Sequence, residues 1–176
     1  MDKQHKGIER IDGATIDMVR EEKALEDTGV FKNIRIEAFT VPSQHQSDYA
    51  YELNEFQGAL LFHIKGKNKF DSVEALEQDT SGSLGKNTLK VEGEILDMRI
   101  ASPGARMWGG ALAGSSYMDI YLRLVDNEGA VLQEKIIATH NNAYAAAWAA
   151  GSSDRSMPRD MAEIIGEYLV TVIPSE

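Results

Sequence analysis

The sequence predicts an α+β fold in which two helices pack on one face of a mixed β-sheet. Three observations lead to this prediction. A strand, an amphipathic helix and a second strand follow one another over residues 31–76, three further strands are expected over residues 88–139, and the chain ends in another amphipathic helix. The strand–helix–strand order favours a crossover with parallel strands, whereas strands joined by short turns are antiparallel.

The first unit is a β-α-β unit. Residues 31–41 alternate around Ile34 and Ile36 and end before Pro42, which is typical of a strand. Residues 70–76 predict the second strand of the unit. Between the two strands, residues 47–65 repeat apolar side chains every three or four positions and predict a helix with one apolar face: Tyr49, Leu53, Phe56, Leu60 and Ile64.

The next three strands predict an antiparallel meander. Residues 88–100 carry apolar side chains on one parity up to Ile95 and on the other parity afterwards, which indicates a β-bulge. Residues 116–125 alternate apolar and polar side chains, and residues 126–129 supply a turn before the returning strand at 130–139.

The chain ends in a second amphipathic helix that stops before Pro174. Its apolar stripe consists of Met161, Ile164, Ile165, Tyr168, Leu169 and Val172. Because each long helix has a single apolar face, we expect both on the same side of the sheet. We therefore divide the chain into a polar N-terminal arm or short helix at residues 1–29 and a single α+β domain at residues 30–176.

Composition excludes several classes of function. The 18 Lys and Arg residues against 28 Asp and Glu residues give a net charge of −10, which repels nucleic-acid phosphates and anionic membrane surfaces. The absence of Cys excludes Cys-ligated zinc, thiol catalysis and disulfides. The polar first ten residues lack the apolar core of a signal peptide, so the protein is either cytoplasmic or made with an export segment that precedes this sequence.

The connection at residues 101–115 is the most distinctive segment. Its glycines could present backbone N–H groups to an anion, although the Gly-Lys-Ser/Thr ending of a P-loop is absent. The alternative is a long hairpin loop in which glycine allows tight packing. The candidate ligand-binding residues are Gly104, Gly109, Gly110 and Gly114.

Large apolar residues in this connection and in the alanine-rich residues 141–151 predict a surface for a partner. Trp108 and Trp148 would lie on neighbouring loops, where aromatic anchors dominate binding energy; structural anchoring is the alternative for both. Arg106 could pair with an acidic group of the partner. The candidate partner-binding residues are Arg106, Met107, Trp108, Leu112, Tyr144 and Trp148.

The histidines offer little support for catalysis or metal binding. None of the four lies within four residues of another, so no His-x-x-x-His metal pair exists, and we predict no metal and no cofactor. His63 is interpreted as a half-buried packing residue. His140 is the one candidate general base, for which spacing identifies no partner nucleophile.

The order of motifs resembles a family of bacterial proteins, mostly small lipoproteins, that is characterised only as a domain of unknown function. The likeness covers about residues 30–173. It rests on the strand at 31–36, the Phe-x-x-Val step at 70–73, Val91–Ile95, Gly104-Ala105-Arg106, Gly109-Gly110, Gly114 and the turn at 124–132. The element order is also similar to the TolB N-terminal domain and the curli-secretion lipoprotein.

This resemblance implies export, a lipid anchor on an upstream Cys and a periplasmic role beside the outer membrane, and it carries no catalytic residues. We therefore expect a non-enzymatic binding or assembly module of the cell envelope, with a protein partner or self-association and no nucleic acid. The first alternative is a small-ligand or anion-binding domain that uses the 101–115 connection. The second is an unrecognised hydrolase.

Overall fold

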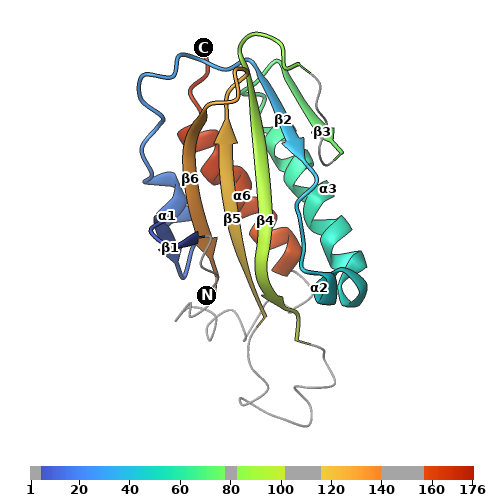
Figure 1. Cartoon of the computed structure of the whole chain (residues 1–176). Coiled ribbons are helices and arrows are strands. Elements are labelled where there is room, and N and C mark those ends of the chain that lie inside the picture. The colour runs from blue at the N-terminus through green and yellow to red at the C-terminus, as the bar shows by residue number, and fades with distance from the viewer. Residues whose placement is uncertain (1–4, 78–82, 102–115, 140–156) are drawn as a thin grey trace.

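The computed structural model describes residues 5–77, 83–101, 116–139 and 157–176. They form a mixed six-stranded sheet in the order β1-β6-β5-β4-β2-β3 (Figure 1). The strands are β1 (Arg10–Asp12), β2 (Asn33–Glu37), β3 (Ser72–Leu76), β4 (Thr88–Arg99), β5 (Tyr117–Val125) and β6 (Val131–Ala138).

The pairing confirms both predicted units. Strand β2 is parallel to β3 and to β4, and the meander β4-β5-β6 is antiparallel. The predicted parity switch is a register shift between Ile95 and Asp97. It keeps Val91 and Ile95 before the shift, and Met98 after it, in the core.

The helices are α1 (Ile16–Arg20), α2 (Ser43–Asp48), α3 (Ala50–Gly66) and α6 (Met157–Val172). Helices α1, α6 and α3 cover the same face of the sheet, with α6 in the middle in contact with both neighbours (Figure 1). The prediction of an α+β fold with two substantial helices on one face is confirmed. No helix in the described part of the chain is long and apolar enough to cross a membrane.

Alternation along the strands builds the core. In β5 the side chains of one parity are buried under the helices, and those of the other parity face away. The helices add their apolar stripes to the same layer. The largest fully buried side chains in this core include Tyr168, Phe56, Ile34, Leu60, Met118 and Leu122.

Two predicted elements differ from the structure at their ends. The strand expected at 31–41 is continuous only over Asn33–Glu37. Beyond it the Phe39 ring lies on Gly93 and edge-on to Phe56, with centroids 5.3 Å apart, and Thr40 makes an isolated parallel bridge to Glu94. The helix expected at 47–65 is divided into α2 and α3 at Tyr49, whose φ of −126° and ψ of 28° are not helical.

The N-terminal residues contain one element that the sequence did not predict. Strand β1 pairs in parallel with β6 through Arg10–Asp12 and Ile136–Ala138. Helix α1 is a single short helix that begins after Thr15, whose hydroxyl accepts a hydrogen bond from the Met18 N–H.

Candidate functional site

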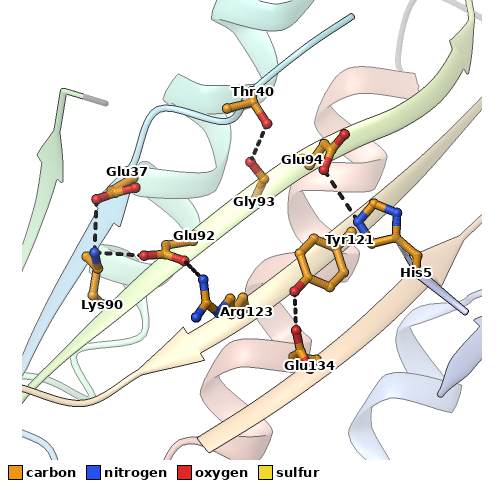
Figure 2. A network of polar contacts seen from close by, with 10 residues as sticks. All are labelled: His5, Glu37, Thr40, Lys90, Glu92, Gly93, Glu94, Tyr121, Arg123 and Glu134. Atoms are coloured by element: carbon orange, nitrogen blue, oxygen red, sulfur yellow. Dashed lines mark hydrogen bonds and ion pairs between the residues drawn. The ribbon is translucent and has the colours of Figure 1, made fainter. Parts of the chain in front are cut away.

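The face of the sheet opposite the helices is polar and partly exposed. We call it the polar face and define it by the side chains that alternate with the core on the three central strands and β2. An antiparallel sheet commonly leaves one face solvated. The polar face includes Glu37, Lys90, Glu92, Glu94, Asp97, Tyr117, Tyr121, Arg123 and Glu134, most of which Figure 2 shows as sticks.

A ladder of ion pairs crosses three strands of this face. Lys90 Nζ lies 2.7 Å from Glu92 and 3.2 Å from Glu37. Arg123 Nη1 donates to the other oxygen of Glu92 at 3.2 Å, which extends the ladder from β4 to β5 (Figure 2). The hydrogen bond with Glu92 raises the pKa of Lys90, so the Lys90 ammonium group stays charged at neutral pH. The side chains are thus held in fixed positions by their neighbours.

A second group surrounds Tyr121. Its hydroxyl donates a short hydrogen bond to Glu134, and burial, followed by this bond, raises its pKa. The His5 ring lies against the Tyr121 ring with centroids 4.5 Å apart, and His5 Nε2 is 3.4 Å from Glu94 (Figure 2). His5 is itself buried, so the residue nearest the N-terminus in the described ranges covers part of the polar face.

A third group lies where β4 ends. Asp97 accepts a hydrogen bond of 2.9 Å from the Tyr117 hydroxyl, and His45 of α2 places Nε2 3.3 Å from the same carboxylate. Burial, followed by the Asp97 hydrogen bond, raises the pKa of Tyr117 to about 12. Tyr117 is therefore a neutral donor at physiological pH.

The polar face combines charges of both signs with the rings of Tyr117 and Tyr121. Tyrosine and arginine are enriched in protein interfaces, whereas lysine and the carboxylates are depleted there. The pattern that could have identified the polar face was already present in the sequence, as the polar parity of residues 116–125. The alternation separates apolar from polar side chains, but it does not by itself assign the polar side a role.

The helix side contains two buried charges that join separate elements. The Glu167 carboxylate, 6% exposed, accepts hydrogen bonds of 3.0 Å from Arg20 Nε and 3.0 Å from His63 Nε2, and a short contact from Lys67. Burial by itself raises the pKa of Glu167, but the three donors outweigh it and lower the pKa to about 2. Glu167 therefore ties α1 and the end of α3 to α6.

Lys135 is the second buried charge. Its side chain is 2% exposed, and its ammonium group lies 2.8 Å from Glu9 and 2.9 Å from Glu22. Burial lowers the pKa of Lys135, but hydrogen bonds to the two carboxylates outweigh burial and raise it. A lysine that stays charged between two carboxylates is a structural anchor, here for the N-terminal segment.

The residues predicted to bind a partner or a ligand lie outside the described ranges, as does His140. These predicted residues are Gly104, Arg106, Met107, Trp108, Gly109, Gly110, Leu112, Gly114, Tyr144 and Trp148. Their proposed roles stay predictions.

The residues from which the two segments depart lie together. The Ala101 N–H donates to Ser116 Oγ at 2.9 Å, and Thr139 Oγ1 accepts from the Met118 N–H at 2.8 Å. Thr139 Oγ1 also lies 3.9 Å from Met157 Sδ. Ser116, Met118, Thr139 and Met157 therefore lie at the same edge of the core.

No cluster of three or more His, Asp or Glu side chains suited to a metal ion occurs among the residues whose structure is described. His63 is 19% exposed and lies against Gly166 while bonding Glu167. Its surroundings are those of a packed side chain within an ion-pair cluster.

Comparison with known proteins gives a distant likeness in fold. No family model and no curated protein matches the chain. The PelC dodecamer from Paraburkholderia phytofirmans is 11% identical, with a TM-score of 0.49, over 81% of this chain and 89% of that chain. A single-residue variant of the same PelC dodecamer is 8% identical, with a TM-score of 0.43, over 77% and 89%. A likeness of this degree concerns the arrangement of elements and carries no argument about function.

Proposed function

We propose that the chain is a binding or assembly module of the bacterial cell envelope that works without catalysis, and that the polar face contacts its protein partner. The observation that carries the proposal is the ladder formed by Glu37, Lys90, Glu92 and Arg123 on a rigid sheet. Charges that are already held in place cost less entropy to bury in an interface than free side chains do.

The arrangement of charges favours selectivity for one partner. A partner with complementary charges gains favourable electrostatic energy at each fixed charge, whereas a mismatched partner places like charges together and is repelled. Tyr117 and Tyr121 add aromatic surface among these charges, with hydroxyl groups that already have carboxylate acceptors. A protein surface with acidic and basic groups in alternation fits this face better than a uniformly charged polymer.

The location in the envelope forms the second part of the proposal. It is supported by the order of motifs over residues 30–173, which resembles small bacterial lipoproteins. A periplasmic position at the outer membrane, reached through a lipid anchor upstream of this sequence, follows from that resemblance.

Site-specific photo-crosslinking in the native bacterium tests both parts. We expect p-benzoylphenylalanine in place of Tyr121 or Arg123 to yield a covalent protein adduct in the envelope fraction. The same group in place of Glu128, in the exposed turn between β5 and β6, should yield none. Equal labelling from all three positions would overturn the polar face as the binding surface, and adducts confined to the cytoplasmic fraction would overturn the envelope location.

A pair of matched charge reversals sharpens the test. With the crosslinker at Tyr121, we expect Arg123→Glu to reduce adduct formation at least tenfold, because it breaks the ladder at Glu92. Arg159→Glu is the control, since Arg159 is 69% exposed on the helix side and pairs with Glu55. Equal yields from the two variants would show that charge on the polar face plays no part in binding.

A further inference from the structure

Helix α3 exposes two large aromatic side chains that the fold does not use. Tyr51 is 73% exposed and Phe62 is 80% exposed. They are eleven positions apart, and at about 100° per residue the second returns to within about 20° of the first, three turns along the helix. Both therefore point directly away from the buried side chains Phe56, Leu60 and Ile64.

A glycine lies between the two aromatic residues on the same stripe. Gly58 is exposed in the middle of α3, and no atom lies within 4 Å of the position that a Cβ would take. Glycine weakens a helix interior, and neither a turn nor internal packing requires it here. Its effect on the surface is a gap between two protruding rings.

We propose that this stripe of Tyr51, Gly58 and Phe62 packs against the same stripe of a second copy of the chain, with the two α3 helices antiparallel. In that orientation each Tyr51 meets the partner's Phe62, so both ends of the contact pair two aromatic rings. Gly58 lies near the crossing, where the missing side chain allows the helix axes to approach closely.

The charges beside the stripe set the orientation. The first turn of α3 carries the acidic Glu52, and its last turn carries the basic Lys65. An antiparallel pair places the acidic end of one copy beside the basic end of the other, whereas a parallel pair would place like charges together. The acidic end and the net charge of −10 also disfavour an anionic membrane as the occupant.

The size of the contact predicts a weak dimer. Each aromatic side chain can bury about 150–250 Å², so four of them supply less than the roughly 1,200 Å² of the smallest stable interfaces, to which their neighbours add. We expect a dissociation constant of about 10–100 μM. This contact lies on the side of the sheet opposite the polar face, so it can be tested independently of the proposed function.

Because the chain has no Cys, a single engineered thiol reports the geometry directly. We expect Gly58→Cys to form a disulfide-linked dimer under mild oxidation at least tenfold faster than Glu128→Cys, the control in the exposed β5–β6 turn. Equal rates for the two variants would overturn the crossing at Gly58.

Sedimentation equilibrium across a dilution series tests the contact without a covalent bond. Phe62→Glu should weaken self-association at least tenfold, whereas Val131→Glu, at an exposed apolar residue on β6, should leave it unchanged. A wild-type chain that stays monomeric at 1 mM, or a dimer that Phe62→Glu does not weaken, would overturn the proposal. Arg123→Glu should leave the dimer unchanged, which separates this proposal from the polar face.

Mixed charge variants test the antiparallel orientation. Lys65→Glu makes both ends of the stripe acidic, and Glu52→Lys makes both ends basic. We expect each variant alone to be monomeric at 100 μM and an equimolar mixture to form the heterodimer. Failure of the mixture to associate more tightly than either variant alone would overturn the charge pairing.

Discussion

Helices α3 and α6 lie side by side on one face of the sheet, yet they are buried to very different extents. Ten residues of α6 are buried, against three of α3. The cause is position: among the described helices, α6 has α1 on one side and α3 on the other, whereas α3 packs mainly against α6 and against the short α2 at its start. The comparison teaches that an apolar stripe predicts a helix and one buried face. The neighbours of the helix determine how much of its remaining surface is also buried.

The largest expected change in stability comes from a comparison of a core residue of α6 with an outward-facing residue of α3. Leu169 is fully buried, and Leu169→Ala should lower the free energy of unfolding by about 2–5 kcal/mol through the cavity it leaves. Phe62→Ala should change it by less than about 0.5 kcal/mol. Urea unfolding at a concentration where the chain is monomeric measures both, and similar losses would show that the two helices are equally integrated in the core.

A smaller effect is expected at the charge that α6 buries. Glu167 has a folded-state pKa of about 2, below its ordinary value of 4.5. A lowered pKa stabilises the fold above pH 4.5, and this contribution is lost as the pH falls toward 2. Glu167→Gln should therefore cost roughly 3 kcal/mol at pH 7 and almost nothing at pH 2.

Unfolding free energies of the wild type and Glu167→Gln, measured from pH 7 to pH 2, provide the check. Use of the difference between the two chains removes the titration of all other carboxylates. A difference that stays constant across this range would mean that the Glu167 charge does not stabilise the ion-pair cluster.

The smallest effects come from one glycine on each helix. A Cβ on Gly166 of α6 would lie 2.4 Å from His63 Cδ2, which would push the ring away from Glu167. Gly166→Ala should therefore cost roughly 1–2 kcal/mol despite its better helix propensity. Gly58→Ala on α3 meets open space and should stabilise the monomer by about 0.5–1 kcal/mol.

Thermal unfolding of the two glycine variants at low protein concentration should shift the midpoint in opposite directions. Stabilisation by both changes would show that the His63 ring moves without cost. Destabilisation by both would show that the outer surface of α3 around Gly58 is more tightly packed than the exposure of Tyr51 and Phe62 indicates.

Much of the fold could be predicted because its patterns are local. Alternation of Met118, Ile120 and Leu122 identified β5, and the parity switch after Ile95 identified the bulge. Strand β1 was missed because three residues are too few to show a period, and its formation depends on the distant strand β6. The division between α2 and α3 was missed because it is a backbone change at Tyr49 within a continuous apolar pattern.

The candidate site was harder to predict because its contacts are not local. Lys90 and Arg123 are 33 positions apart and are joined through Glu92 only once β4 and β5 are in register. Glu167 receives its donors from α1 and the end of α3, and within the α6 sequence it is one polar residue beside the apolar stripe. Sequence reasoning therefore favoured the Trp- and Gly-containing segments, whose unusual composition is visible without a fold.

The way in which the first described residues are attached has a consequence for biosynthesis. Strand β1 pairs with β6, the Leu25 N–H donates to the Val172 carbonyl at 2.8 Å, and the Phe31 N–H donates to the Pro174 carbonyl at 2.9 Å. Residues 10–31 therefore dock on residues 136–174, which are translated more than 100 positions later. Until Pro174 has left the ribosome, Ile11 and Val19 lack their native cover and are available to a chaperone.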